Sequence, residues 1–130
     1  MGSFSDYSEL KILEHIVGKA TFALPTVYVG LSTSDPLDSG AGLAEPSGNA
    51  YARVLTTGLW SAASVGHIEN AADIVFVMAS GNWGTITHFA LFDALSGGNM
   101  LGHGSLVTPK AIGVDDTAKF AAGDIDITLD

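Results

Sequence analysis

The sequence predicts a mainly β protein: a single β-sandwich or jelly-roll-like domain with an α-helix at its N-terminus. Three observations predict this class. Residues 88–93 form a strand that is apolar on both faces and must therefore be covered on both sides, by the rest of a sandwich or by another subunit. Residues 125–129 alternate strictly between apolar and polar, as a half-buried strand does. Turn residues recur between several short apolar runs, which is typical of sandwiches and jelly rolls.

The first element is a helix expected at about residues 6–17. Ser5 is its expected N-cap, and carboxylates fall in the first turn, where the helix dipole favours anions. An apolar stripe with i, i+3, i+7 spacing indicates a face that packs on the body of the protein; its members are Leu10, Leu13, Ile16 and Val17. Ile12 lies outside this stripe and is expected to be an exposed contact.

After Pro25 the apolar period changes from 3.6 to 2, which indicates strands. The expected strands lie at residues 26–31, 51–56, 73–78, 88–93, 100–106, 118–120 and 125–129. Residues 32–49 are rich in Ser, Gly, Asp and Pro and are expected to form a long loop, and residues 96–99 a tight hairpin turn. A further turn is expected at residues 108–110. The expected organisation is an N-terminal arm and helix at residues 1–24, followed by a β-sandwich domain at residues 25–130.

Composition excludes several classes of partner. The chain carries 14 Asp and Glu against 5 Lys and Arg, a net charge of −9, which opposes binding to nucleic acid and to anionic membranes. No apolar run approaches the length of a membrane span, and Cys is absent, so no thiolate metal site is expected. Hydrophobic residues make up 47% and charged residues only 15%, which favours surfaces that are covered by a partner.

No catalytic residue, cofactor site or metal site is expected. His88 and His103 are expected to meet across a hairpin as a polar pair, without a third ligand at zinc spacing. The acidic pairs at residues 35–38 and 115–116 suit Ca²⁺ ligation, but turn capping is the favoured interpretation. A glycan hydrolase needs two apposed carboxylates, and no such pair stands out. The aromatic residues suit a core or an interface better than a sugar platform.

The apolar residues nominated as interface contacts share large size and placement near the expected helix or strands: Phe4, Ile12, Trp60, Trp83, Phe89 and Phe92. Two of them, Trp83 and Phe89, are also expected to anchor the core around residues 88–93. The doubly apolar strand and the low charge favour self-association, with a homotrimer as the expected state.

Several segments, taken together in order and spacing, carry a family resemblance: residues 5–7, 27–36, 45–54, 83–93, 108–110 and 120–124. With them the chain resembles, nearly end to end, a family of small proteins encoded among tailed-phage structural genes. Such proteins are commonly labelled tail fibre proteins, and some look like capsid decoration proteins. The chain departs from the family pattern before Tyr51, where Asn49-Ala50 replaces the usual double glycine.

The resemblance implies a structural role in the virion. The first interpretation is a capsid decoration (cement) protein that binds the outside of the capsid, with the major capsid protein or other virion proteins as partners. The alternative is a tail fibre or tail-tip component that binds a host receptor and presents the loop at residues 32–49. In either case residues 2–17 are expected to attach the chain to its neighbours, or else to cap one end of the sandwich.

Overall fold

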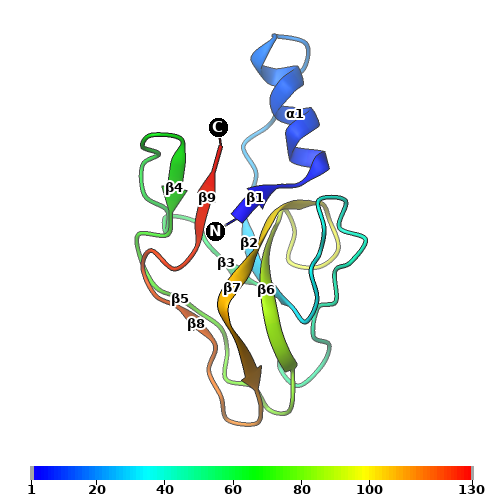
Figure 1. Ribbon diagram of the computed structural model, residues 1–130, viewed down its shortest axis with the longest axis vertical. Helices are drawn as coiled ribbons and strands as arrows, with labels where there is room; N and C mark the ends of the chain where they lie inside the picture. The colour runs from blue at the N-terminus through cyan, green and yellow to red at the C-terminus, as the bar shows by residue number, and fades with distance from the viewer. Residues whose placement is uncertain (1, 130) are drawn as a thin grey trace.

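The protein is mainly β with a single N-terminal helix, which confirms the predicted class (Figure 1). The computed structural model describes residues 2–129, so the terminal residues of the predicted ranges, Met1 and Asp130, lie outside it. The elements are β1 (Gly2–Phe4), α1 (Asp6–Ile16), β2 (Tyr28–Ser32), β3 (Val54–Leu55), β4 (His67–Glu69), β5 (Ile74–Val75), β6 (Gly84–Phe92), β7 (Met100–Ile112), β8 (Lys119–Phe120) and β9 (Asp126–Thr128).

Seven strands form one curled mixed sheet in the order β3-β2-β6-β7-β1-β9-β4, and β5 and β8 form a small second sheet. The long hairpin of β6 and β7 lies at the centre of the seven-stranded sheet. The register of this hairpin passes from Ile86 opposite Lys110 to His88 opposite Ser105, so residues 106–109 bulge out of the ladder. The turn expected at residues 108–110 is therefore part of β7. The bend is made by a bulge within the strand.

The N-terminal segment is not a separable arm. β1 runs antiparallel to β7, with Gly2 opposite Gly104, and parallel to β9, with Gly2 opposite Ile127. It therefore lies inside the sheet, and the predicted boundary at residue 24 divides β1 from the strands that it pairs with. Removing residues 2–17 would therefore break strand pairing, because β1 is an internal strand of the sheet.

The doubly apolar strand is covered on both faces by its own chain. On one face Phe89 packs edge-on against Phe120 with 6.0 Å between ring centroids. On the other face Phe92 lies under the Arg53 guanidinium, which is 3.4 Å from the ring centroid. Trp83, Phe89 and Phe92 have only 4%, 1% and 2% of their surface exposed. The structure therefore places these three nominated interface residues in the core of the chain itself.

Several expected strands are shorter in the structure than in the sequence pattern. Only Val54–Leu55 and Ile74–Val75 form ladders within the runs at 51–56 and 73–78. The next residues still form single backbone bonds: the Thr56 N–H donates to the Val27 carbonyl at 3.0 Å, and the Phe76 N–H donates to the Ala118 carbonyl at 2.9 Å. Trp60 is half-buried and donates its indole N–H to the Thr56 hydroxyl at 2.9 Å. Periodicity alone does not distinguish such extended loop segments from strands.

Candidate functional site

Helix α1 carries its apolar side chains on the side that faces away from the body. Ser5 is the N-cap, as predicted, and its hydroxyl accepts the N–H of Ser8 at 3.2 Å. The predicted apolar stripe exists but is exposed, at 64% for Leu10, 64% for Leu13, 76% for Ile16 and 75% for Val17. We call these four side chains the outer face of α1. The expectation that they pack on the domain is wrong.

Backbone hydrogen bonds hold the N-terminal end of α1 against β7 and the long loop. The backbone N–H of Ser5 donates to the Leu101 carbonyl at 3.1 Å, and that of Asp6 donates to the Asp38 carbonyl at 2.9 Å. Ser8 is the buried residue of the helix, with 2% of its surface exposed. Ser8 and the partly buried Tyr7 face the body, whereas the four residues of the outer face are turned away from it. In Figure 1 the helix stands at one end of the molecule, beyond the strands.

The remaining nominated contacts lie close to this region. Phe4 is half-buried against the core at the end of β1, and Ile12 is half-buried on α1. Leu24, in the segment that returns from the helix to β2, is 97% exposed and was not nominated. Leu24 stands between Ala23 and Pro25 and belongs to no apolar periodic pattern, so the sequence does not single it out.

Beneath the long loop lies a buried ionic cluster that was not predicted as a unit. The Arg53 Nε donates to Glu45 Oε2 at 3.0 Å, and its Nη2 donates to Glu45 Oε1 at 2.6 Å. The Tyr51 hydroxyl donates to the same carboxylate at 2.6 Å and accepts the N–H of Leu31 at 2.9 Å. A bidentate pair of this kind is strong and directional. We call these three side chains, Glu45, Tyr51 and Arg53, the Glu45–Arg53 node.

The node joins three parts of the chain. The Arg53 Nη1 donates to the carbonyls of Ala94 and Gly97, both at 2.8 Å, which ties the loop to the turn between β6 and β7. Burial, together with the hydrogen bond to Glu45, raises the pKa of Tyr51, so its hydroxyl stays a donor. The one sequence signal for the node was a charged residue, Arg53, between apolar neighbours in residues 51–56.

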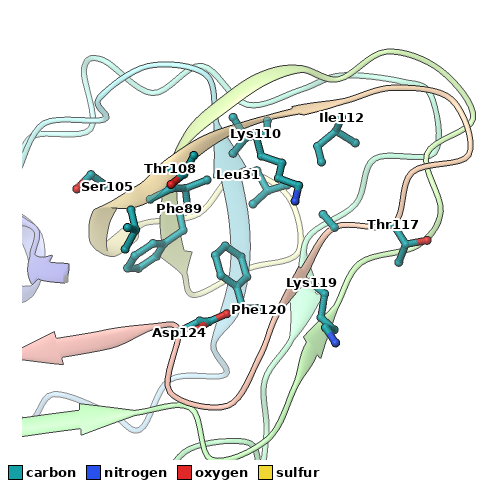
Figure 2. Close-up of a pocket in the computed structure, with 14 residues that line it drawn as sticks. Leu31, Phe89, Ser105, Thr108, Lys110, Ile112, Thr117, Lys119, Phe120 and Asp124 are labelled. Carbon is teal, nitrogen blue, oxygen red and sulfur yellow. The ribbon is translucent and has the colours of Figure 1, made fainter.

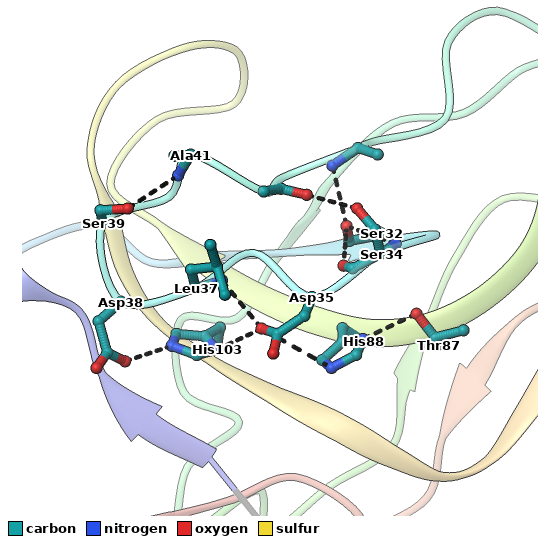
Figure 3. A network of polar contacts seen from close by, with 12 residues as sticks. Ser32, Ser34, Asp35, Leu37, Asp38, Ser39, Ala41, Thr87, His88 and His103 are labelled. Atoms are coloured by element: carbon teal, nitrogen blue, oxygen red, sulfur yellow. Dashed lines mark hydrogen bonds and ion pairs between the residues drawn. The ribbon is translucent and has the colours of Figure 1, made fainter.

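A second polar network pins the same loop to the middle of the hairpin (Figure 3). His103 Nε2 lies 2.8 Å from Asp38 Oδ1, and His88 and His103 each place a ring nitrogen 3.9 Å from Asp35 Oδ1. The two histidines therefore approach one shared carboxylate from neighbouring strands, and a direct contact between their rings stays a prediction. The Thr87 hydroxyl lies 2.8 Å from His88 Nδ1, but the opposite nitrogen is too far from Asp35 for a hydrogen bond, so no hydrogen-bonded relay forms.

The acidic loops use their carboxylates to cap turns. Asp35 Oδ1 accepts the N–H of Leu37 at 2.9 Å, and Asp116 Oδ2 accepts the N–H of Gly113 at 2.7 Å. Within residues 2–129, no group of three or more His, Asp or Glu side chains has the geometry to hold a metal ion. None of the helices in that range is long and apolar enough to cross a membrane.

A groove of about 510 Å³ opens between β7 and the segment that contains β8 (Figure 2). Its floor is the edge of the core, where Phe89 and Phe120 face each other, and Lys110 and Lys119 lie along its walls. The Lys119 ammonium is 3.7 Å from the Asp73 carboxylate, so its charge is already opposed within the chain. The groove is thus an opening over the aromatic core, bordered by the bulge of β7.

One comparison with known proteins identifies a family. A family model described as "Podophage GP4 fiber I protein gp80" matches residues 3–128, which is nearly the whole chain. No curated protein matches the chain. The match covers α1, the Glu45–Arg53 node and the β6–β7 hairpin together.

Proposed function

The chain belongs to the podophage GP4 fiber I protein family, and on this premise we propose that it is a subunit of a fibre of the podophage virion. The family establishes a structural role in the virion and a location there. The proposal adds the position within the particle. The single observation that carries it is the match to a fibre protein over residues 3–128, because that match includes α1 as well as the β body of the chain.

The geometry supports a structural part better than a catalytic one. The most polar clusters of the described chain are the Glu45–Arg53 node and the Asp35–His88–His103–Asp38 network. Both hold the loop between β2 and β3 against the hairpin. Side chains committed to such bonds make a rigid module, and we propose that the protein is not an enzyme.

Capsid decoration is the second candidate. The observation that favours it is the compact β body, which shows neither a repeat nor a coiled-coil heptad array of the kind that builds a fibre shaft. The acidic charge of −9 also suits an outer surface away from packaged DNA. The fibre proposal is preferred because a compact domain serves equally well at the base or tip of a fibre, and the family is named for fibres.

Homotrimerisation stands as a separate proposal. The sequence feature that suggests a trimer is the doubly apolar strand. Its two faces are covered within the single chain by Phe120 and Arg53. Sedimentation of the purified protein at micromolar concentration is the measurement. A species of three chains supports a trimer, and a monomer both in solution and in the density map of the virion contradicts it.

Electron microscopy of virions tests the position. Particles assembled with and without the gene for this chain are compared as density maps. Difference density on the tail or collar, into which the β body fits, supports a fibre subunit. Density distributed over the capsid lattice supports decoration instead, and two identical maps, with no chain detected by mass spectrometry, contradict both candidates.

A further inference from the structure

We propose that the outer face of α1 docks into a groove of another virion protein whose floor is apolar and whose rim carries Lys or Arg side chains. This inference rests on the proposed place of the chain in the virion. It assigns the attachment to one surface of one element and specifies the chemistry of the partner.

The side of α1 that faces the body is polar at Ser8, and the side that faces solvent is apolar. Ser8 is 2% exposed, whereas Leu13 is 64% exposed and Val17 is 75% exposed. Ser8 and Val17 are separated by about two and a half turns, so they point to opposite sides of the helix. A helix that packed only on its own body would show the reverse arrangement. Four large apolar side chains gathered on one outward face indicate a surface that a partner covers.

The outer face of α1 has the shape of a ridge. Leu10, Leu13 and Val17 follow an i, i+3, i+7 spacing, and Ile16 widens the ridge on one side. Side chains at this spacing form a single ridge along a helix, which is the form that enters a hydrophobic groove. The helix is also fixed to the sheet at its first turn by the Ser5 and Asp6 backbone bonds, so the ridge is presented at a set angle.

The charge beside the outer face of α1 distinguishes a second copy of this chain from a different protein as the partner. The carboxylates of Asp6, Glu9 and Glu14 lie on α1 beside the outer face, and among the described residues none of the three takes part in an ion pair. A second copy would bring the same three carboxylates to the contact against the single Lys11 of α1, and its whole chain carries a net charge of −9. Like charges at a helix contact are destabilising, whereas Lys or Arg on the partner's rim would be complementary. The favoured occupant is therefore a different, basic-rimmed protein.

The test supplies variants of the full chain in trans during assembly of particles that lack the gene. The amount of chain per purified virion is then measured by quantitative mass spectrometry. Because β1 is part of the sheet, point substitutions are used in place of a deletion. The double variant Leu13→Ser, Val17→Ser removes the centre of the outer face. We expect its incorporation to fall by a factor on the order of a hundred, since each large apolar side chain that loses its burial weakens binding about tenfold.

The matched control changes equally exposed apolar residues elsewhere. Val107 is 102% exposed and Val114 is 63% exposed, both on the body. The double variant Val107→Ser, Val114→Ser should be incorporated like the wild type. Both double variants should keep the wild-type melting temperature, since the replaced side chains are already in water.

A charge pair of variants tests the chemistry of the partner's rim. Glu9→Gln with Glu14→Gln should be released from virions at lower salt concentration than the wild type, because it lacks the contacts to Lys or Arg. Lys19→Gln changes charge beyond the end of the same helix and should not be released earlier. Equal release of the glutamine variant and the wild type would overturn the basic rim.

The outcomes separate the inference from the function on which it rests. If the wild-type chain is absent from purified virions, the proposed function fails. If the wild type and the Leu13→Ser, Val17→Ser variant are incorporated equally, the function stands and the inference is overturned. If the purified wild type is an oligomer that the same double variant disperses, the outer face is covered by further copies of this chain, which also overturns the inference.

Discussion

The Arg53 guanidinium lies 3.4 Å from the centroid of the Phe92 ring while it forms a bidentate ion pair with Glu45 on its edge. One cation thus covers an apolar face of the central hairpin and neutralises the carboxylate of the long loop. Arg53 is 8% exposed, so both interactions occur away from bulk water.

We expect Arg53→Met to destabilise the fold by about 3–5 kcal/mol, because it leaves the Glu45 carboxylate without its buried partner. Urea unfolding at neutral pH measures the free energy. Lys19→Met, at an exposed position, is the control and should stay within about 0.5 kcal/mol of the wild type. A loss below about 1 kcal/mol for Arg53→Met would mean that water or a relaxed loop takes over the role of the guanidinium.

Trp83→Ala should cost about 3–5 kcal/mol and yield aggregated or loosely packed protein, since the indole is buried at 4% exposure. The Trp83 Nε1 also donates to the Asn49 carbonyl at 2.9 Å. Trp83→Phe separates the two contributions, because it keeps most of the aromatic volume and removes the hydrogen bond. An unchanged melting temperature for Trp83→Ala would contradict the core assignment.

Ala50→Gly should stabilise the protein by about 1 kcal/mol. Ala50 has a φ of 67° and follows Asn49 at 52°, so both residues that replace the family's double glycine lie in the left-handed region. Alanine is strained there and glycine is not. Ala52→Gly, at an exposed neighbouring position without positive φ, is the matched control and should destabilise by about 0.5–1 kcal/mol. Equal effects at the two positions would show that strain at Ala50 is not released.

Alkaline conditions should weaken the fold through Tyr51. Burial, and then the hydrogen bond to Glu45, raise its pKa above the ordinary 10.0. A raised folded-state pKa contributes stability that is present below the unfolded value and is lost as pH rises towards the folded value. The unfolding free energy of the wild type should therefore fall above about pH 10 more steeply than that of Tyr51→Phe. Parallel curves would show that the phenol is not protected from ionisation.

Chelators should leave the unfolding curve unchanged. The Asp35 and Asp116 carboxylates accept backbone hydrogen bonds within their own turns, which accounts for their position without a bound cation. Thermal unfolding with and without EDTA is the measurement. A lowered melting temperature in EDTA that added Ca²⁺ restores would identify a metal site at one of these loops.

Much of the fold could be predicted from local pattern. The Ser5 cap, the start of α1 and the hairpin at residues 96–99 depend on neighbouring residues, so the sequence contains their cause. The direction of the apolar face of α1 could not be predicted in this way. Periodicity identifies the stripe, but the side on which the sheet lies is set by the backbone bonds of Ser5 and Asp6 to distant residues.

The Glu45–Arg53 node also combines a local sequence signal with contacts to distant residues. Arg53 stood out as a charge among apolar neighbours, but its partners Glu45, Ala94 and Gly97 are brought to it only by the folded chain. The place of β1 was also beyond local reasoning, because three residues carry too little pattern to predict pairing with strands about a hundred residues away.

The position of β1 between β7 and β9 has a consequence for synthesis. The ribosome delivers β1 before β7 and β9, so β1 gains its second neighbour only after β9 has been synthesised. Contacts of such long sequence separation form late and slowly. A prematurely terminated copy lacks β9, which leaves one edge of β1 and the partner edge of β4 open. Only a chain that includes β9 closes this part of the sheet, so translation through Thr128 becomes a condition for an assembly-competent subunit.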